Sequence, residues 1–168
     1  MTDFTAPNAV AKDLMTQALV CAHPEQPLAE LELLLIEHRI SGVPVVEQGR
    51  LIGVISRSDI ARVEVLVESL DGSVSDQMRW DTQADGFQHP AQPAYHGFRG
   101  RLDNLAVKDA MHDQVVTCRP DTPVVEVAAD MVRHHIHRVI VVEGDHPVGI
   151  VSSLDIVKLV AAHSRRDV

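Results

Sequence analysis

A serine followed three residues later by an aspartate occurs twice in this sequence, each time after a glycine and a run of apolar residues. The two pairs are Ser56 with Asp59 and Ser152 with Asp155. A serine hydroxyl and the N–H groups at a helix start can bind a phosphate, and a carboxylate can accept hydrogen bonds from a ribose diol. The same pair can instead only cap a helix, because both side chains can satisfy backbone N–H groups. Both interpretations stay open at this point.

Three histidines, His134, His135 and His137, crowd another short stretch and raise the question of a zinc site. Adjacent residues point to different faces of a helix. The sequence also contains an internal repeat, described below, in which His134 aligns with His38, and no further histidine closely follows His38. We therefore expect a structural position near a helix end and predict no metal site. The sequence has no nucleophile elbow, P-loop or His-Glu-x-x-His motif, so we predict no catalytic residues and no enzyme.

The elements that position these residues are repeated, because residues 8–63 align with residues 104–159 without a gap. Identical pairs include Asn8/Asn104, Lys12/Lys108, Asp13/Asp109, Met15/Met111, Pro24/Pro120, Pro27/Pro123 and Gly53/Gly149. Each copy predicts the order strand, helix, strand, strand, helix. A unit of about 55 residues buries little surface alone. We therefore expect an α+β fold in which repeat 1 (residues 1–70) and repeat 2 (residues 104–168) pack sheet against sheet with pseudo-two-fold symmetry.

Local signals predict the element boundaries. Asn8 and Asn104 are candidate N-caps for turns at 10–15 and 106–111, and Thr122 is a candidate cap for a helix whose first position is Pro123. Runs of β-branched and apolar residues predict short strands at 19–22, 43–47, 51–55, 115–118, 139–143 and 148–151. Helices should begin near Ser56 and Ser152, which places both aspartates three residues into a helix.

Composition narrows the classes of function. The net charge of −9 and the pI near 5.5 disfavour a nucleic-acid partner, which needs clustered Lys and Arg. No stretch reaches the roughly 18 apolar residues of a spanning helix, so we expect no membrane partner. The two cysteines, Cys21 and Cys118, lack metal-type spacing and suit a reducing compartment. The sequence predicts a cytoplasmic protein.

An insert at residues 71–103 separates the repeats and contains nearly all the aromatic residues of the chain: Trp80, Phe87, Tyr95 and Phe98. It contains several glycines and prolines and shows no sustained periodicity, so we expect a long loop. Loops of this length in compact proteins are usually functional or disordered. Three roles stay open: a connector whose aromatics dock on the core, a segment that wraps a second protomer, and a flap over a ligand cleft.

The chain resembles a tandem pair of cystathionine β-synthase (CBS) domains, also called a Bateman module. The resemblance rests on residues 10–15 and 107–111, on the hydrophobic-Pro-Val-Val segment at residues 43–46, and on both Gly-x-x-Ser-x-x-Asp segments. It implies β-α-β-β-α units, frequent pairing of two chains, and inter-repeat clefts that bind AMP, ADP or ATP. It also implies that Asp59 and Asp155 hold ribose, and that Ser56 and Ser152 help with phosphate.

The second copy is the better candidate for a nucleotide site. His137 and Arg138 resemble the basic segment that precedes a strand in nucleotide-binding members of the family, whereas the first copy has Ser41 and Gly42 there. Arginine suits a phosphate because it offers several N–H donors. The aligned residues 8–63 and 104–159 contain no aromatic residue for stacking, so adenine would lie between aliphatic groups, for instance Val116 and Ile136.

These observations predict a stand-alone regulatory protein without a required cofactor. It would bind an adenine nucleotide as a regulatory ligand, act in energy sensing, form a homodimer and signal occupancy to an unknown regulated protein. The alternative is a scaffold that uses the CBS fold to dimerise and binds no nucleotide. In that case the serine and aspartate pairs would serve as caps only.

Overall fold

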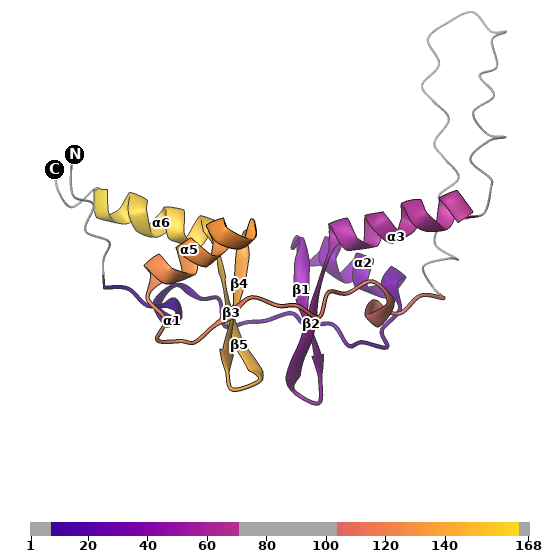
Figure 1. Cartoon of the computed structure of the whole chain (residues 1–168), viewed down its shortest axis with the longest axis horizontal. Helices are drawn as coiled ribbons and strands as arrows, with labels where there is room; N and C mark the ends of the chain where they lie inside the picture. The colour runs from indigo at the N-terminus through magenta and orange to yellow at the C-terminus, as the bar shows by residue number, and fades with distance from the viewer. Residues whose placement is uncertain (1–7, 71–103, 165–168) are drawn as a thin grey trace, which may run out of the picture. The chain divides into compact units, whose positions relative to one another are not determined.

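A computed structural model describes residues 8–70 and 104–164; the predicted connector at 71–103 lies outside this range (Figure 1). The elements are α1 (Ala11–Leu14), α2 (Leu28–Glu37), β1 (Gly42–Glu47), β2 (Arg50–Ser56), α3 (Arg57–Leu70), η2 (Val107–Asp109), β3 (Thr117–Cys118), α5 (Val124–His134), β4 (Arg138–Glu143), β5 (His146–Ser152) and α6 (Ser153–Ser164). Helices and two small sheets, β1-β2 and β3-β4-β5, confirm the α+β class. Within the described part of the chain, no helix is long and apolar enough to cross a membrane.

The chain divides into two compact units, and each combines separate stretches of sequence. Unit 1 comprises Met1–Cys21, Pro44–Val54 and His112–Val168, and unit 2 comprises Ala22–Val43 and Ile55–Met111. The opening residues of the first repeat therefore belong with the body of the second, and residues 104–111 belong with α2 and α3. The domain boundaries predicted at 1–70 and 104–168 follow the sequence repeats. They do not coincide with the two compact units, because each unit contains the opening segment of the other repeat.

In unit 1, β4 is the central strand of a three-stranded sheet. It pairs in parallel with β3 and antiparallel with β5. Helix α5 contacts β4, helix α6 contacts β5, and the two helices contact each other (Figure 1). Their buried apolar side chains form one cluster: Ala11, Cys118, Val127, Met131, Val139, Val141 and Val151. Burial of these side chains is the main source of stability for such a small unit.

The same backbone hydrogen bonds anchor the exchanged segments in both units. In unit 1, the N–H groups of Ala11 and Lys12 donate to the carbonyls of Thr122 and Pro120, at 2.8 and 2.9 Å. In unit 2, the N–H groups of Val107 and Lys108 donate to Gln26 and Pro24, both at 2.9 Å. These residues are equivalent in the two repeats, so the two units hold their exchanged segments in the same way.

Several local predictions are wrong. The N-caps of α1 and η2 are Val10 and Ala106 rather than Asn8 and Asn104. The carboxylates of Asp13 and Asp109 satisfy the N–H groups of these caps, each at 2.9 Å, so an asparagine side chain is not needed there.

Two further predictions about helix and strand starts are also wrong. Helix α5 begins at Val124 with Pro123 as its N-cap, and the Thr122 hydroxyl instead accepts a hydrogen bond from the Arg119 N–H at 2.9 Å. In the first repeat no strand forms at residues 19–22, whereas β3 forms at the equivalent place in the second repeat. The first repeat keeps only a single β-bridge there, at Ala22, because the length of the pairing depends on the neighbouring strand, which local sequence does not reveal.

Helices α2 and α5 end in the same motif, with a non-glycine residue in the left-handed conformation. These residues are Arg39 and His135, both with φ of 53°. The following N–H groups, of Ile40 and Ile136, donate back to Leu35 and Met131 at 3.0 Å, which closes each helix end. The expectation that the histidine cluster lies near a helix end is therefore confirmed, since His134 is the last residue of α5.

Candidate functional site

Ser152 and Asp155 lie together at the junction of β5 and α6. Asp155 Oδ2 accepts hydrogen bonds from the Ser152 N–H at 3.0 Å and from the Ser152 hydroxyl at 2.6 Å. The Ser152 hydroxyl in turn accepts the Asp155 N–H at 3.3 Å. The other carboxylate oxygen, Oδ1, lies 3.2 Å from the Lys158 Nζ. Oδ2 therefore accepts the hydrogen bonds of Ser152, whereas Oδ1 contacts only the ammonium at the end of the flexible Lys158 side chain among the described residues.

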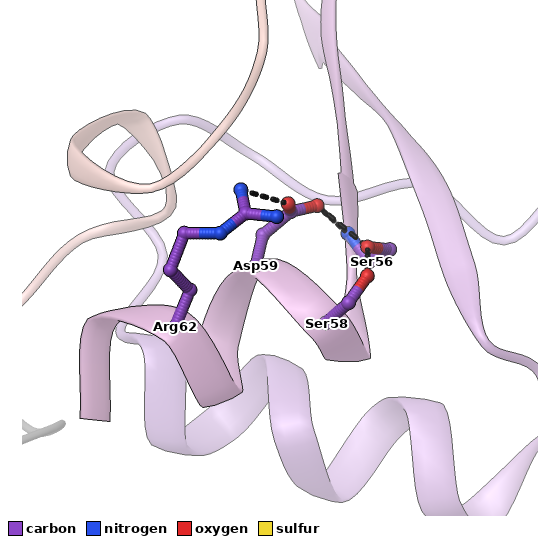
Figure 2. Close-up of polar contacts among 4 residues, drawn as sticks. All are labelled: Ser56, Ser58, Asp59 and Arg62. Atoms are coloured by element: carbon purple, nitrogen blue, oxygen red, sulfur yellow. Dashed lines mark hydrogen bonds and ion pairs between the residues drawn. The ribbon is translucent and has the colours of Figure 1, made fainter. Parts of the chain in front are cut away.

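The equivalent pair in the first repeat has the same core geometry. Asp59 Oδ2 accepts from the Ser56 N–H at 2.9 Å and from its hydroxyl at 2.6 Å, and Oδ1 lies 3.4 Å from Arg62 (Figure 2). One difference is the Ser58 hydroxyl, 2.7 Å from that of Ser56. Because the Ser56 hydrogen points to Asp59, Ser58 must donate. Each serine hydroxyl therefore donates one hydrogen bond and accepts one, but Ser56 accepts from the Ser58 hydroxyl and Ser152 accepts from the Asp155 N–H, since Leu154 stands in place of Ser58.

Most of the N–H groups at the start of α6 are satisfied inside the protein. The Ser153 N–H donates to the His137 carbonyl at 2.9 Å, and Ser152 and Asp155 use theirs within the cap. Among the first four N–H groups, that of Leu154 remains for an external anion. Side chains must therefore supply most of the donors for a phosphate, rather than the helix N-terminus that sequence reasoning emphasised.

Three predicted site residues, Arg138, Ser152 and Val116, lie at the same end of the strands of the sheet. Arg138 begins β4 and lies directly opposite Ser152, the last residue of β5. Thr117 of β3 pairs with Ile140 in a parallel register, so Val116 lies one step before the start of β3, at the same edge. His137 precedes Arg138 and is exposed. Ile136 is half-buried and packs against the apolar cluster of unit 1. All six predicted residues of the second site therefore belong to unit 1.

The first site is more closed. The Asp59 side chain is 9% exposed and that of Asp155 is 19% exposed. At the place of Arg138 the first repeat has Gly42, and a side chain there would lie 2.9 Å from the Ile55 carbonyl oxygen. A basic residue at this position would therefore collide with the backbone. The sequence predicted that only the second site has basic residues before its strand, and in the first site the backbone at Gly42 has no room for a basic residue.

Hydrogen bonding keeps Asp155 charged. Burial alone would raise the pKa of its carboxyl, but hydrogen bonds from the Ser152 hydroxyl and N–H, and from the Lys158 ammonium, outweigh burial and lower the pKa below its ordinary value. An ionised carboxylate is only an acceptor, so a ribose hydroxyl can donate a hydrogen bond to it.

Arg62 and Lys158 are the residues that sequence reasoning missed. They occupy equivalent positions three residues after Asp59 and Asp155, on the same helix face. A basic residue at this spacing from each motif aspartate was the available signal.

Within residues 8–70 and 104–164, no three metal-binding side chains gather in one place. His135 is the left-handed C-cap of α5, and His137 lies in the turn before β4. Cys118 is buried, and burial together with the charge of Asp130 raises the pKa of its thiol to about 11. His135 therefore has a structural position at the end of α5.

The fold and the site define a duplicated α+β module in which a strand runs into a helix through a serine, with an aspartate one turn later. The family model of the CBS domain matches residues 11–65 and 107–162, which is more than half of the chain. The chain belongs to the CBS domain family, and the prediction of a tandem pair is confirmed.

Two similar proteins match over most of their length. The CBS domain-containing protein YhcV of Bacillus subtilis is 26% identical over 145 residues, which cover 86% of this chain and 81% of YhcV. Protein MJ1426 of Methanocaldococcus jannaschii is 29% identical over 154 residues, 88% of either chain. The A-adding tRNA nucleotidyltransferase of Geobacter sulfurreducens is 22% identical over 99% of this chain, but this chain spans only 15% of that enzyme.

Solved structures show the same fold. The CBS domain pair of protein MJ0100, crystallised with 5′-methylthioadenosine and S-adenosyl-L-methionine, is 26% identical with a TM-score of 0.64, over 90% of this chain and 99% of that one. The CBS domain of a membrane protein from Sphaerobacter thermophilus is 28% identical with a TM-score of 0.66, over 90% and 87%.

Proposed function

We propose that this chain is a regulatory CBS pair that binds an adenine nucleotide, AMP, ADP or ATP, at the site built from Ser152, Asp155, Arg138 and His137. Binding would take place in the cytoplasm and would be signalled to a separate regulated protein, without catalysis. The two ligands crystallised with protein MJ0100 both contain adenosine, which supports the adenosine part of this proposal.

The observation that carries the proposal is that the two oxygens of the Asp155 carboxylate have different partners. Oδ2 is used by the cap, whereas Oδ1 faces only the exposed Lys158 among the described residues, so a ribose hydroxyl can reach it. Arg138, opposite Ser152 in the sheet, adds positive charge on the side from which a phosphate would approach. Adenine would pack against aliphatic groups such as Val116 and Ile136.

The nucleotide can act as a switch only if it binds one arrangement of the protein more tightly than another. Coupling of this kind is typically about 1–3 kcal/mol. In a homodimer, the two chains could pair in two different arrangements, and the nucleotide could favour one of them.

We propose a homodimer that pairs through the outer faces of α5 and α6. Val125 and Val132, two turns apart on α5, are 55% and 74% exposed, and Leu154 and Val157 on α6 are 59% and 60% exposed. Large exposed apolar side chains on two helices that contact each other are typical of interaction surfaces. Analytical ultracentrifugation of Val132→Glu together with Val157→Glu tests this interface, and an unchanged dimer would place it elsewhere.

Thermal unfolding with AMP, ADP and ATP tests nucleotide binding. A ligand at about 100 times its dissociation constant stabilises the folded protein by roughly 2.7 kcal/mol. Asp155→Asn should abolish this ligand-induced shift, whereas the matched variant Asp59→Asn should keep it. The asparagine retains the size of the side chain, so each variant is compared with its own ligand-free midpoint. A wild type that no nucleotide stabilises would contradict the proposal.

The alternative function is a dimerisation scaffold without a ligand. It is favoured by the hydrogen bonds that the Ser56 and Ser152 hydroxyls donate to Asp59 and Asp155 within each motif. The scaffold predicts a concentration-dependent dimer whose melting temperature does not respond to nucleotides.

A further inference from the structure

The ammonium of Lys158 lies where a ribose hydroxyl would have to bind. Asp155 Oδ2 already accepts two hydrogen bonds from Ser152, so the ligand must use Oδ1, and Lys158 Nζ is 3.2 Å from that oxygen. The Lys158 side chain is 67% exposed, and its described polar contact is this one. Any ligand that binds ribose through Asp155 must therefore displace the lysine or share the oxygen with it.

Displacement is inexpensive, because an exposed ion pair contributes at most about 1 kcal/mol. What happens to the ammonium afterwards depends on the ligand. An anionic 5′ substituent within reach of the flexible lysine side chain gives the ammonium a new partner. A neutral substituent leaves it in water, and a cationic one repels it. The lysine therefore adds the same competition for every adenosine ligand but compensates only the anionic ones.

The position carries a cation in both repeats. Arg62, the equivalent of Lys158, lies 3.4 Å from Asp59 Oδ1, although its guanidinium faces a less exposed carboxylate. In the second repeat the neighbouring Arg138 adds a further positive charge opposite Ser152. The charge of the site thus comes from two elements, β4 and α6, within one compact unit.

From this geometry we infer that Lys158 is a specificity-determining residue, which makes the Asp155 site select adenosine ligands with an anionic 5′ group over neutral or cationic ones. This inference rests on the proposed function, since it concerns the same site.

Calorimetric titration of AMP and of 5′-methylthioadenosine, a neutral analogue, tests it. The wild type should prefer AMP. Lys158→Met should lower the ratio of the two affinities by about fivefold, through weaker AMP binding and equal or tighter binding of the neutral analogue. Lys158→Arg should retain the preference, and the matched control Arg62→Met should behave as the wild type.

Two results would overturn the inference, and they are distinguishable. If Lys158→Met and the wild type bind both ligands with the same affinity ratio, the lysine has no role in selection and the nucleotide site itself stands. If the wild type binds neither ligand, the proposed function fails and the inference fails with it.

Discussion

Met15 packs against Gly149 so closely that a side-chain carbon added to the glycine would lie 2.8 Å from Met15 Cγ and 3.0 Å from Met15 Cβ. The two residues are far apart in sequence, but α1 and β5 are in contact within unit 1. Both belong to pairs that recur in the repeat, Met15 with Met111 and Gly53 with Gly149. The close approach explains why a glycine is needed at position 149.

Gly149→Ala should therefore destabilise the protein by about 1–3 kcal/mol, the usual cost of forcing an extra carbon into a packed core. Urea unfolding measures this loss. Met15→Ala removes the atoms that collide, so the double variant should be less destabilised than the sum of the two single variants. Additive effects would show that the two residues do not interact.

Asp155→Asn should lower stability at pH 7 by about 0.5–2 kcal/mol, the range found for loss of a helix cap. The folded-state pKa of Asp155 lies below its ordinary value. Its charge therefore contributes stability that is fully present above the unfolded pKa, about 3.9, and is lost as the pH falls through the folded pKa.

Urea unfolding at pH 7 and near pH 2.5 should accordingly show a difference between wild type and Asp155→Asn that shrinks with acid. Asp113→Asn serves as the control, because Asp113 is exposed and no polar partner is assigned to it within the described residues. A difference for Asp155→Asn that persists unchanged in acid would mean that carboxylate charge is not its source.

Cys118 should resist alkylation in the folded protein, whereas Cys21 should react. The thiolate is the reactive form, and with a pKa of about 11 roughly one Cys118 thiol in a thousand is ionised at pH 8. Cys21 is exposed. Iodoacetamide labelling followed by peptide mass spectrometry should show one modified cysteine before denaturant and both after it. Equal labelling rates in the native state would contradict the buried position of Cys118.

His135→Gly should stabilise the protein by about 0.5–1 kcal/mol. His135 has φ of 53°, where a side chain is disfavoured by about 1–2 kcal/mol and glycine is not, although glycine also costs some chain entropy. His134→Gly, in the last turn of the same helix, should destabilise and is the matched control. Thermal unfolding of both variants measures the sign, and a loss of stability for His135→Gly would show that its side chain makes a compensating contact.

Much of the fold could be predicted because its signals are local. The runs that became β1, β2, β4 and β5 are rich in β-branched residues, and Ser56 and Ser152 precede the helices they cap. The first strand of the first repeat could not be predicted correctly, because pairing at residues 19–22 depends on a neighbour rather than on propensity. The caps at Asn8 and Asn104 were wrong because the carboxylates of Asp13 and Asp109 already satisfy the same N–H groups.

The sequence by itself determined the duplication, the α+β class and the identity of the two serine and aspartate pairs, since periodicity and spacing along one chain carry that information. Only the tertiary structure decided that the opening segments exchange between the repeats and that Met15 meets Gly149. It alone decided that the backbone at Gly42 leaves no room for a basic side chain in the first site and that Lys158 lies beside Asp155 Oδ1. The physical reason is that these relationships depend on which surfaces pack together and how much water each side chain keeps, and neither quantity is a property of neighbouring residues in the chain.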